Sequence, residues 1–339
     1  MQPDQRLRIA IDAMGGDHGP SITVPAALAV LAEYPDLQII LVGQEPLLSS
    51  LVAKRASEFG DRLRVHHAEQ VVAMDERPQD AMRKKKDSSM RVALNLLESG
   101  EALACVSAGN TGALMATARF VLKTISGIDR PAILSRIPTH HGHTHMLDLG
   151  ANADCTPEHL FQFAVMGTVV ATDPQHLPKP RVGLLNIGSE DIKGNELVQQ
   201  AAKLLEQSTL NYVGFIEGND IFSGKVDVVV TDGFTGNVAL KTMEGVARMM
   251  SAAMKREYTR NPLRRLAALV SMPVLKAIKK RFDPGHHNGA SMVGLNGVVI
   301  KSHGSADTSA FANAIRVAIV EARQGVPSQV SQLLQEQVR

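Results

Sequence analysis

The sequence predicts an α/β protein built on a largely parallel sheet. Short runs of aliphatic and β-branched residues alternate with longer segments of helical period, which is the pattern of βαβ units. The chain has 339 residues, 44% of them hydrophobic, which is enough to bury a sizeable core. No linker rich in Gly, Ser or Pro divides it. We therefore expect a single α/β domain over residues 1–339, either undivided or as two lobes that share the sheet.

The predicted strands are the short apolar runs that end in a small or polar turn. They cover residues 7–12, 37–42, 63–66, 103–107, 132–137, 145–149, 182–186, 212–216, 226–231 and 297–301. The predicted helices fill the gaps between them, where apolar residues recur with helical spacing. They cover residues 21–32, 45–58, 88–98, 112–122, 157–171, 196–206, 235–258 and 305–323.

The formal charge of +2, from 36 Lys and Arg against 34 Asp and Glu, excludes a wholesale nucleic-acid binder. With no Trp and three Tyr, the chain also has few platforms on which bases could stack. The charge is unevenly spread. Residues 255–281 hold nine basic residues and one acid, a local charge of +8, which leaves −6 on the other residues. The protein is an acidic body that carries one basic segment.

Cysteine usage and the N-terminal sequence indicate a cytoplasmic protein. Cys105 and Cys155 cannot form a disulfide framework, and neither has the spacing of a zinc site. Cys105 lies within an apolar strand, so we interpret it as part of the core and not as a nucleophile. The N-terminal residues lack the pattern of a secretory signal, and the apolar stretches fall short of the roughly 20 residues that a spanning helix needs.

Six of the predicted strands end in turns of small and polar residues. They read DAMGGDHGP (12–20), SAGNTG (107–112), DLGAN (148–152), NIGSEDIKGN (186–195), TDGFTGN (231–237) and KSHGSAD (301–307). Ligands of open α/β sheets bind beyond the carboxyl ends of strands, so we expect these turns to outline one shared site. Alternatively, their glycines only make tight connections. Two of the turns lead directly into a helix, where backbone N–H groups favour a phosphate-sized anion. Neither G-x-G-x-x-G nor a P-loop is present, so a nucleotide site is not supported.

Taken in order, these stretches resemble the phosphate acyltransferase PlsX family. The matching segments are RIAIDAMGGDHGP (8–20), MRKKKDSSM (82–90), SAGNTGALMA (107–116), RPA (130–132), LDLGAN (147–152), LLNIGSEDIKG (184–194), DGFTGNVALKTMEG (232–245) and VVIKSHGSAD (298–307). The sequence departs from the family pattern at Ser189 and over residues 282–290.

The resemblance implies an enzyme that makes acyl phosphate from long-chain acyl-acyl-carrier protein and inorganic phosphate, at the start of bacterial phospholipid synthesis. It also implies a three-layer α/β/α fold related to phosphotransacetylases and isocitrate-type dehydrogenases, and a homodimer. A membrane-bound glycerol-phosphate acyltransferase is a further expected partner. Two alternatives stay open: a phosphotransacetylase-like enzyme that uses acyl-CoA, and a membrane-associated scaffold or regulator that has kept the fold.

The implied reaction requires a site that holds an anion against a thioester carbonyl. The leaving thiol, with a pKa near ~8.5, needs little protonation, so positioning and electrostatic stabilisation dominate and no cofactor is needed. As phosphate or substrate ligands we predict Gly15, Gly16, Asn110, Thr111, Gly112, Asp232, Thr235, Gly236, Asn237 and Lys241. As catalytic residues we predict Asp12, Asp17, His18, Lys193 and His303, with Lys193 or Lys241 as the source of positive charge.

Each of these roles has a plainer alternative. Asp12 and Asp17 could brace the first turn, the two lysines could be solvated surface charges, and His303 could be satisfied by a backbone hydrogen bond. Ser107 lacks the G-x-S-x-G turn of serine hydrolases. The cluster His140, His141, His143 and His145 has no assigned role. Its last three members could share one face of a strand and bind a metal, but we predict no metal site.

Two basic segments have candidate partners. Arg83, Lys84, Lys85 and Lys86 are either ordinary surface charges or a docking site for the acidic carrier protein. In residues 261–282, Pro262 and Pro273 predict the starts of two short helices, which with the basic residues of 255–282 form an amphipathic hairpin. The hairpin suits peripheral contact with the anionic inner face of the membrane, unless its apolar residues pack in the core or in a dimer interface. The predicted contacts are Leu266, Leu269, Val270, Val274, Leu275, Ile278, Lys279 and Lys280.

Overall fold

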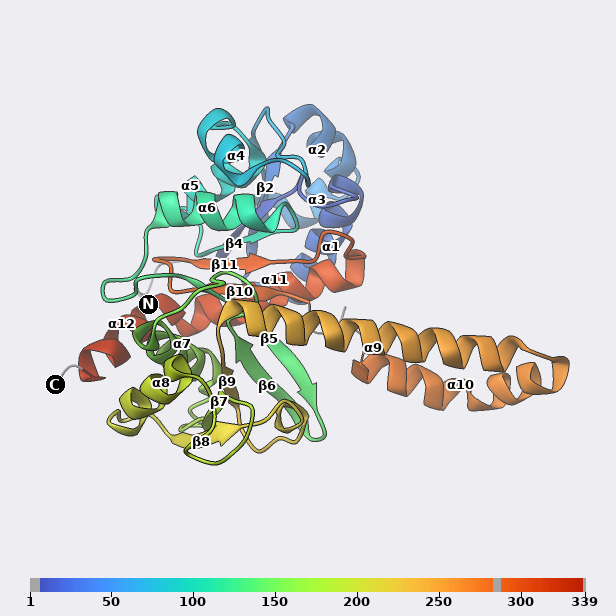
Figure 1. The fold of residues 1–339 in the computed structure, drawn as a ribbon. Coiled ribbons are helices and arrows are strands. Elements are labelled where there is room, and N and C mark those ends of the chain that lie inside the picture. Colours follow the sequence, from blue (N-terminus) through green and yellow to red (C-terminus); the bar gives the residue numbers. More distant parts are fainter. Residues whose placement is uncertain (1–6, 283–287, 338–339) are drawn as a thin grey trace.

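The computed structural model describes residues 7–282 and 288–337, and Figure 1 shows their fold. A single sheet of eleven described strands runs through the molecule in the order β3-β2-β1-β4-β11-β10-β5-β6-β9-β7-β8. The strands are β1 (Arg8–Asp12), β2 (Gln38–Gly43), β3 (Leu63–His67), β4 (Ala104–Ser107), β5 (Ala132–Thr139), β6 (Gly142–Leu147), β7 (Val182–Leu185), β8 (Tyr212–Ile216), β9 (Val228–Val230), β10 (Ala290–Val293) and β11 (Val298–Lys301).

Helices connect the strands and cover the sheet. They are α1 (Pro20–Glu33), α2 (Glu45–Val52), α3 (Ala56–Phe59), α4 (Pro78–Lys84), α5 (Ser89–Glu98), α6 (Thr111–Leu122), α7 (Pro157–Ala171), α8 (Glu196–Glu206), α9 (Gly233–Thr259), α10 (Pro262–Phe282), α11 (Thr308–Gln324) and α12 (Val326–Gln337). Short 3₁₀ turns occur at Gly60–Arg62 and Asp220–Phe222.

Both faces of the sheet are buried, so the fold has the predicted three layers. In β1, Ile9 and Ile11 pack with Phe311 of α11, whereas Ala10 between them packs with Leu94 of α5 on the opposite face. This alternation follows from the two-residue period of a strand. In the second half of the sheet, α7, α8 and α12 cover one face, and the base of α9 packs near the other. The apolar runs seen in the sequence are therefore strands buried on two sides.

The sheet is largely parallel, as predicted, but its two halves run in opposite directions. Strands β3, β2, β1, β4 and β11 are mutually parallel, and so are β6, β9, β7 and β8. Three antiparallel pairings lie between the halves: β11 with β10, β10 with β5, and β5 with β6. Because β10 is antiparallel to both β11 and β5, β5 runs in the direction of the first half, and the direction changes where β6 pairs with β5. The four-residue strand β10 was not predicted from the sequence.

Three helical predictions need correction. The helix expected over 45–58 is two helices, α2 and α3, separated by a turn at residues 53–55. Helices α4 and α12 were not predicted. α4 is short, with only Ala81 buried, whereas α12 buries Val326, Val330 and Leu334 at helical spacing, a signal that the sequence offered. The two short helices expected in 261–282 are one helix, α10, with Pro273 inside it. Pro273 removes one intrahelical hydrogen bond, which costs little where water can reach the freed carbonyl.

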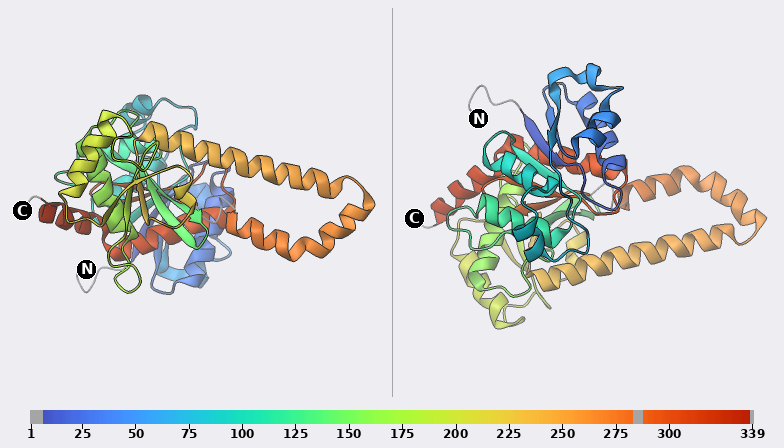
Figure 2. Two further views of the ribbon diagram at one scale, coloured as in Figure 1. Left: turned by 60° about the horizontal axis from the view of Figure 1, so that its bottom comes forward. Right: turned by 90° about the horizontal axis from the view of Figure 1, so that it is seen from above.

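The basic segment belongs to a hairpin that projects from the body. Helices α9 and α10 contact each other and extend well beyond the sheet and its covering helices in each view (Figures 1 and 2). The hairpin was predicted, but its first arm is the 27-residue helix α9 and not a short helix within 261–282. The side chains of Ile278, Lys279 and Lys280, predicted as membrane contacts, lie outside the described residues.

Candidate active site

Three neighbouring strands of the first half end in a row of polar residues. Asp12 of β1 pairs in register with Ser107 of β4, and Ser107 pairs in register with Lys301 of β11. Because the strands are parallel, residues in register point to the same face of the sheet. All three side chains are buried, with at most 8% of Lys301 exposed. A carboxylate, a hydroxyl and an ammonium therefore stand side by side under the turns that follow these strands.

The Asp12 carboxylate connects β1 with β4, with α5 and with the turn that follows β1. Its carboxylate accepts hydrogen bonds from the hydroxyls of Ser89 and Ser107, each at 2.6 Å, and from backbone N–H groups of Met14 and Gly15. Burial raises the pKa of Asp12, and these hydrogen bonds oppose the rise. The predicted bracing role fits this geometry. Asp12 does not cap α1, whose first turn follows Gly19 and has no side-chain cap.

The turns after β1, β4 and β11 touch one another. A Cβ on Gly15 would lie 2.5 Å from the Asp12 carboxylate, and one on Gly16 would lie 3.0 Å from the Gly304 carbonyl oxygen. Gly16 also has φ +91°, which favours glycine. The N–H of Asp17 donates to that same Gly304 carbonyl at 2.9 Å. The glycines predicted here are thus needed for close approach of the main chains.

The charged residues of these turns face solvent. Asp17, His18 and His303 are exposed, and they stay candidates for contact with a substrate. The Nδ1 atom of His303 lies 2.9 Å from the Ser305 hydroxyl, and its backbone N–H donates to Asn288. The ring is therefore oriented by a neighbouring side chain.

Asn110 has a structural use for each polar atom of its side chain. Its oxygen accepts the N–H of Ala113 and so caps α6, while its amide nitrogen donates to the carbonyls of Met74 and Glu76. The backbone of Thr111 and Gly112, both exposed, forms the first turn of α6. An anion at this helix start would meet main-chain N–H groups and not the Asn110 side chain.

A second group of predicted residues gathers at the ends of β6 and β9. Asp148 is buried and accepts hydrogen bonds from the backbone N–H groups of Ile133, Gly150, Ala151 and Asn152. Burial raises the pKa of Asp148, and these hydrogen bonds oppose the rise. A Cβ on Gly236 would overlap the Asp148 carbonyl oxygen. The Asp148 carboxylate thus stabilises the turn after β6, as the Asp12 carboxylate stabilises the turn after β1.

Asp232 and Thr235 are engaged with each other. Asp232 caps α9 by accepting the backbone N–H of Thr235 at 2.8 Å and its hydroxyl at 2.7 Å. Asn237 is exposed beside Gly150. Neither predicted lysine is buried nearby: Lys193 is exposed, and Lys241 forms an ion pair with Glu244 at 3.1 Å.

Five of the six turns fall into two groups by direct contact. The turns after β1, β4 and β11 contact one another, and those after β6 and β9 contact one another. Among the described residues, no hydrogen bond joins the two groups. That all six turns outline one shared site stays a prediction.

Lys301 and Ser89 are the residues that sequence reasoning missed. The Nζ of Lys301 donates to the carbonyl of Ala108 at 3.4 Å and to that of Ser302. Burial lowers the pKa of Lys301 to about 8, while the charges of Asp12 and Asp17 oppose the fall. A lysine at the end of an apolar strand, beside two other polar strand ends, was the available signal.

The remaining candidates are structural. Cys105 is buried in the core, and burial raises the pKa of its thiol, as expected for a residue that is not a nucleophile. His145 is buried on β6 and burial lowers its pKa to about 3; its ring meets that of His143 edge-on at 5.0 Å. His140 and His141 lie in the turn before β6. Over residues 7–282 and 288–337, no three His, Cys, Asp or Glu side chains are placed to hold a metal ion.

Comparison with known proteins decides the family. A family model described as "Fatty acid synthesis protein" matches residues 7–329. The phosphate acyltransferase of Nitrosococcus oceani is 60% identical over 325 residues, which are 96% of either chain. That of Methylococcus capsulatus is 58% identical over 324 residues, again 96% of either chain. The chain belongs to the phosphate acyltransferase family.

This assignment confirms the predicted resemblance and makes the protein an acyltransferase. Solved structures agree on the fold. EutD phosphotransacetylase from Staphylococcus aureus matches 94% of both chains with a TM-score of 0.59 at 15% identity. A phosphotransacetylase from Streptococcus pyogenes matches 94% of this chain and 95% of its own, with a TM-score of 0.60 at 17% identity. The relation to the phosphotransacetylase fold is thus confirmed, and the relation to isocitrate-type dehydrogenases stays a prediction.

Proposed function

We propose that this phosphate acyltransferase makes acyl phosphate from long-chain acyl-acyl-carrier protein and inorganic phosphate, early in phospholipid synthesis. The observation that carries the proposal is the junction of the turns after β1, β4 and β11, where the start of α6 and a buried ammonium lie together. Such a junction suits a phosphate dianion.

The proposed reaction needs an anion-binding site and electrostatic stabilisation, and the junction of these turns can supply both. A phosphate oxygen attacks the thioester carbonyl, the C–S bond breaks, and the thiolate leaves with the carrier. Phosphate is already largely dianionic at neutral pH and the thiol is a good leaving group. The site must therefore hold two reactants together and stabilise an oxyanion. Asp17, His18 and His303 are the exposed groups at the junction that could handle a proton.

We propose that the carrier protein docks beside this junction. Within the run 83–86, Lys84 is paired with Asp80 at 2.8 Å and Lys85 with Glu76 at 2.6 Å. Arg83 and Lys86 are exposed and remain available to an acidic partner. The run is joined to the site through Glu76, whose carbonyl accepts from Asn110. Steering of this kind weakens with salt.

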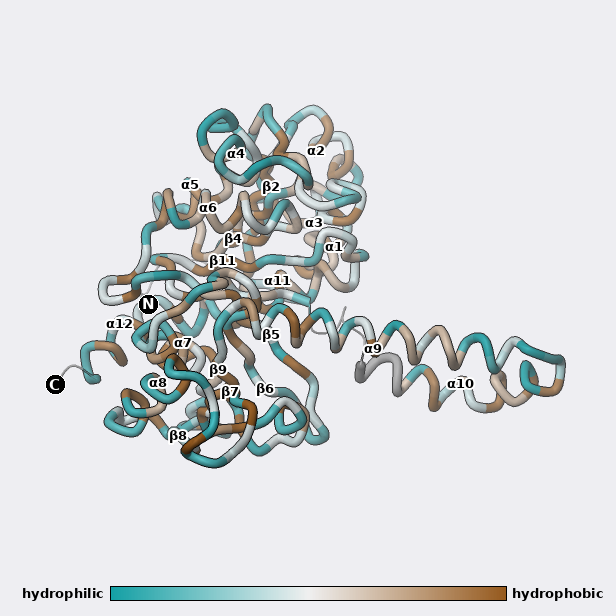
Figure 3. Tube along the Cα trace, in the orientation of Figure 1, coloured by the Kyte–Doolittle hydropathy of each residue, from teal (hydrophilic) through white to brown (hydrophobic). Residues whose placement is uncertain are grey.

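We propose further that the hairpin makes peripheral contact with the anionic inner face of the membrane, the alternative being that its apolar residues pack in the interface of a homodimer. Leu266, Leu269, Val270 and Val274 are all more than half exposed on α10, so the core does not cover them. Leu275 is half-buried. Hydrophobic and hydrophilic residues are interspersed along both arms (Figure 3). No helix of the described residues is long and apolar enough to cross a bilayer.

Release of free thiol from acyl-acyl-carrier protein and from acyl-CoA, measured with and without phosphate, tests the proposal. We expect phosphate-dependent release from the carrier protein, with acyl phosphate as the product. Faster release from acyl-CoA would favour the phosphotransacetylase-like alternative. Release from neither donor would contradict the proposal and favour a scaffold or regulator.

A further inference from the structure

Lys301 is a buried cation on which the carboxylates of Asp12 and Asp17 act without forming a direct ion pair. Its side chain is 8% exposed, and its Nζ donates to two main-chain carbonyls, those of Ala108 and Ser302. It forms no ion pair with any residue of the described ranges. Burying an ammonium without a paired carboxylate is unfavourable, which its lowered pKa of about 8 reflects.

The Lys301 ammonium lies at the junction of three turns. Lys301 ends β11 in register with Ser107, and Ala108, whose carbonyl it contacts, begins the turn that leads into α6. The neighbouring turns after β1 and β11 close around the same point, with Gly16 and Gly304 in contact. An ammonium has three N–H groups, and two are used on carbonyls. One N–H remains at the junction where main-chain groups converge.

We propose that Lys301 supplies the positive charge that binds the acceptor phosphate, with one oxygen of the dianion accepting its remaining N–H. The inference rests on the proposed function for the identity of the anion. Lys193 and Lys241, predicted as sources of this charge, are exposed, whereas Lys301 is buried at the junction. Phosphate would give the Lys301 ammonium a direct anionic partner, through a charge-assisted hydrogen bond.

The charge on Lys301 sets how phosphate binding depends on pH. Two carboxylates bear on it, Asp12 from β1 and Asp17 from the turn after β1. The ammonium is protonated below its pKa of about 8, so the affinity for phosphate should fall as the pH rises above that value. Phosphate itself stays a dianion over this range, so its own titration does not produce the fall.

Inorganic phosphate, titrated calorimetrically into the full-length protein without acyl donor, tests the role of Lys301. We expect Lys301→Met to bind phosphate at least about tenfold more weakly than the wild type, the loss of one charge-assisted hydrogen bond. The wild type should weaken similarly between pH 8 and pH 9.5, where phosphate stays a dianion. Lys301→Arg, which stays charged, should bind at both pH values. Lys203→Met, at an exposed position on α8, is the matched control and should bind like the wild type.

Phosphate binding by Lys301→Met within about twofold of the wild type, or no phosphate binding by the wild type, would overturn the inference. If the Met variant does not fold by circular dichroism, the comparison of wild type and Lys301→Arg across pH decides: equal affinities at pH 9.5 refute the role. Kinetics separate this inference from the proposed function. A wild type that binds phosphate through Lys301 but releases no thiol refutes only the proposed function, whereas thiol release by Lys301→Met with an unchanged KM for phosphate refutes only the role of Lys301.

Discussion

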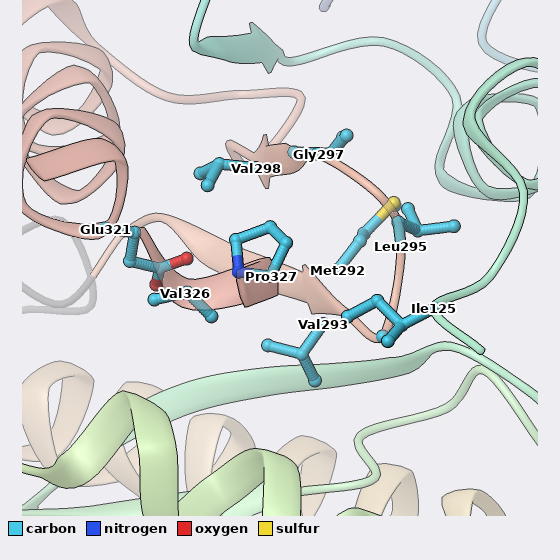
Figure 4. A pocket seen from close by; sticks show the side chains of 11 residues that line it. Ile125, Met292, Val293, Leu295, Gly297, Val298, Glu321, Val326 and Pro327 are labelled. Atoms are coloured by element: carbon cyan, nitrogen blue, oxygen red, sulfur yellow. The ribbon is translucent and has the colours of Figure 1, made fainter. Parts of the chain in front are cut away.

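Glu321 offers a sharp test of how burial acts on charge in this fold. Glu321 lies on α11, is 3% exposed, and accepts a hydrogen bond from the Ser291 hydroxyl on β10. It borders a small cavity whose walls include Val298, Val326 and Pro327 (Figure 4). Burial raises the pKa of Glu321 from 4.5 to about 7, although Ser291 and the charge of Arg136 oppose the rise. The carboxyl group is thus forced to ionise in an apolar setting near neutral pH.

The sign and size of the effect follow from linkage. Below pH 4.5 both the folded and the unfolded chain hold the proton, so burial of the ion costs nothing. Between pH 4.5 and about 7 the unfolded chain ionises while the folded chain keeps its proton, so the folded chain progressively loses stability, and the loss is complete above about pH 7. A pKa moved from 4.5 to about 7 corresponds to roughly 3 kcal/mol at about 1.4 kcal/mol per pH unit. Most of this, roughly 2 to 3 kcal/mol, should appear between pH 5 and pH 8.

Glu321→Gln removes the charge and keeps the oxygen that Ser291 needs. Its new amide N–H groups lower stability by a similar amount at every pH, so the diagnostic is the change with pH. We expect the variant to gain roughly 2 to 3 kcal/mol on the wild type between pH 5 and pH 8, in urea unfolding followed by circular dichroism. Glu98→Gln, at the exposed end of α5, controls for the loss of one negative charge. A wild-type-to-variant difference that stays constant across this range would refute the reasoning.

Three further predictions concern the second turn, the docking run and the hairpin. Gly236→Ala should lower the free energy of unfolding by about 3 kcal/mol or more, because its Cβ would overlap the Asp148 carbonyl. The control Gly245→Ala, on the same helix, places its Cβ in open space and should be neutral or slightly stabilising. Equal melting temperatures for the two variants would contradict this prediction. The double change Arg83→Glu and Lys86→Glu should raise the KM for acyl-acyl-carrier protein by about tenfold at low salt, with the KM for phosphate unchanged; an effect on phosphate alone would count against docking. Leu269→Glu and Val274→Glu should each reduce co-sedimentation with anionic vesicles, and unchanged binding by folded variants would rule out these contacts.

The sequence predicts the strands well because their signal is local. Each parallel strand is buried on both faces and reads as a short apolar run, as in β1 and β2. Strand direction is not local. β10 is only ASMV, its register is defined by pairing with β5 and β11, and no periodicity in four residues separates a strand from a loop. The direction of the second half of the sheet is set where β6 pairs antiparallel with β5, and an apolar run carries no sign of strand direction.

The site residues are likewise hard to predict where they depend on contacts between distant segments. The glycine-rich turns are visible in the sequence, but the role of Lys301 could not be predicted. Its place in the site depends on its register with Ser107, 194 positions earlier in the chain. In the same way, Asn110 could be recognised as a helix-start residue, yet its two bonds to the loop at Met74 and Glu76 depend on packing between α4 and α6. Contacts between distant segments decide which polar side chains are free for a ligand.

The turns in the two halves of the molecule are organised in the same way, and this organisation explains why they are rich in glycine. In each half a buried carboxylate accepts backbone hydrogen bonds from the turn beside it: Asp12 from Met14 and Gly15, and Asp148 from Gly150, Ala151 and Asn152. The other polar side chains are used as helix caps, as Asn110 and Asp232 are. With these side chains occupied, recognition of an anion falls to main-chain N–H groups, which need close approach and therefore glycine. A buried ammonium such as that of Lys301 then supplies the net charge that neutral amides cannot.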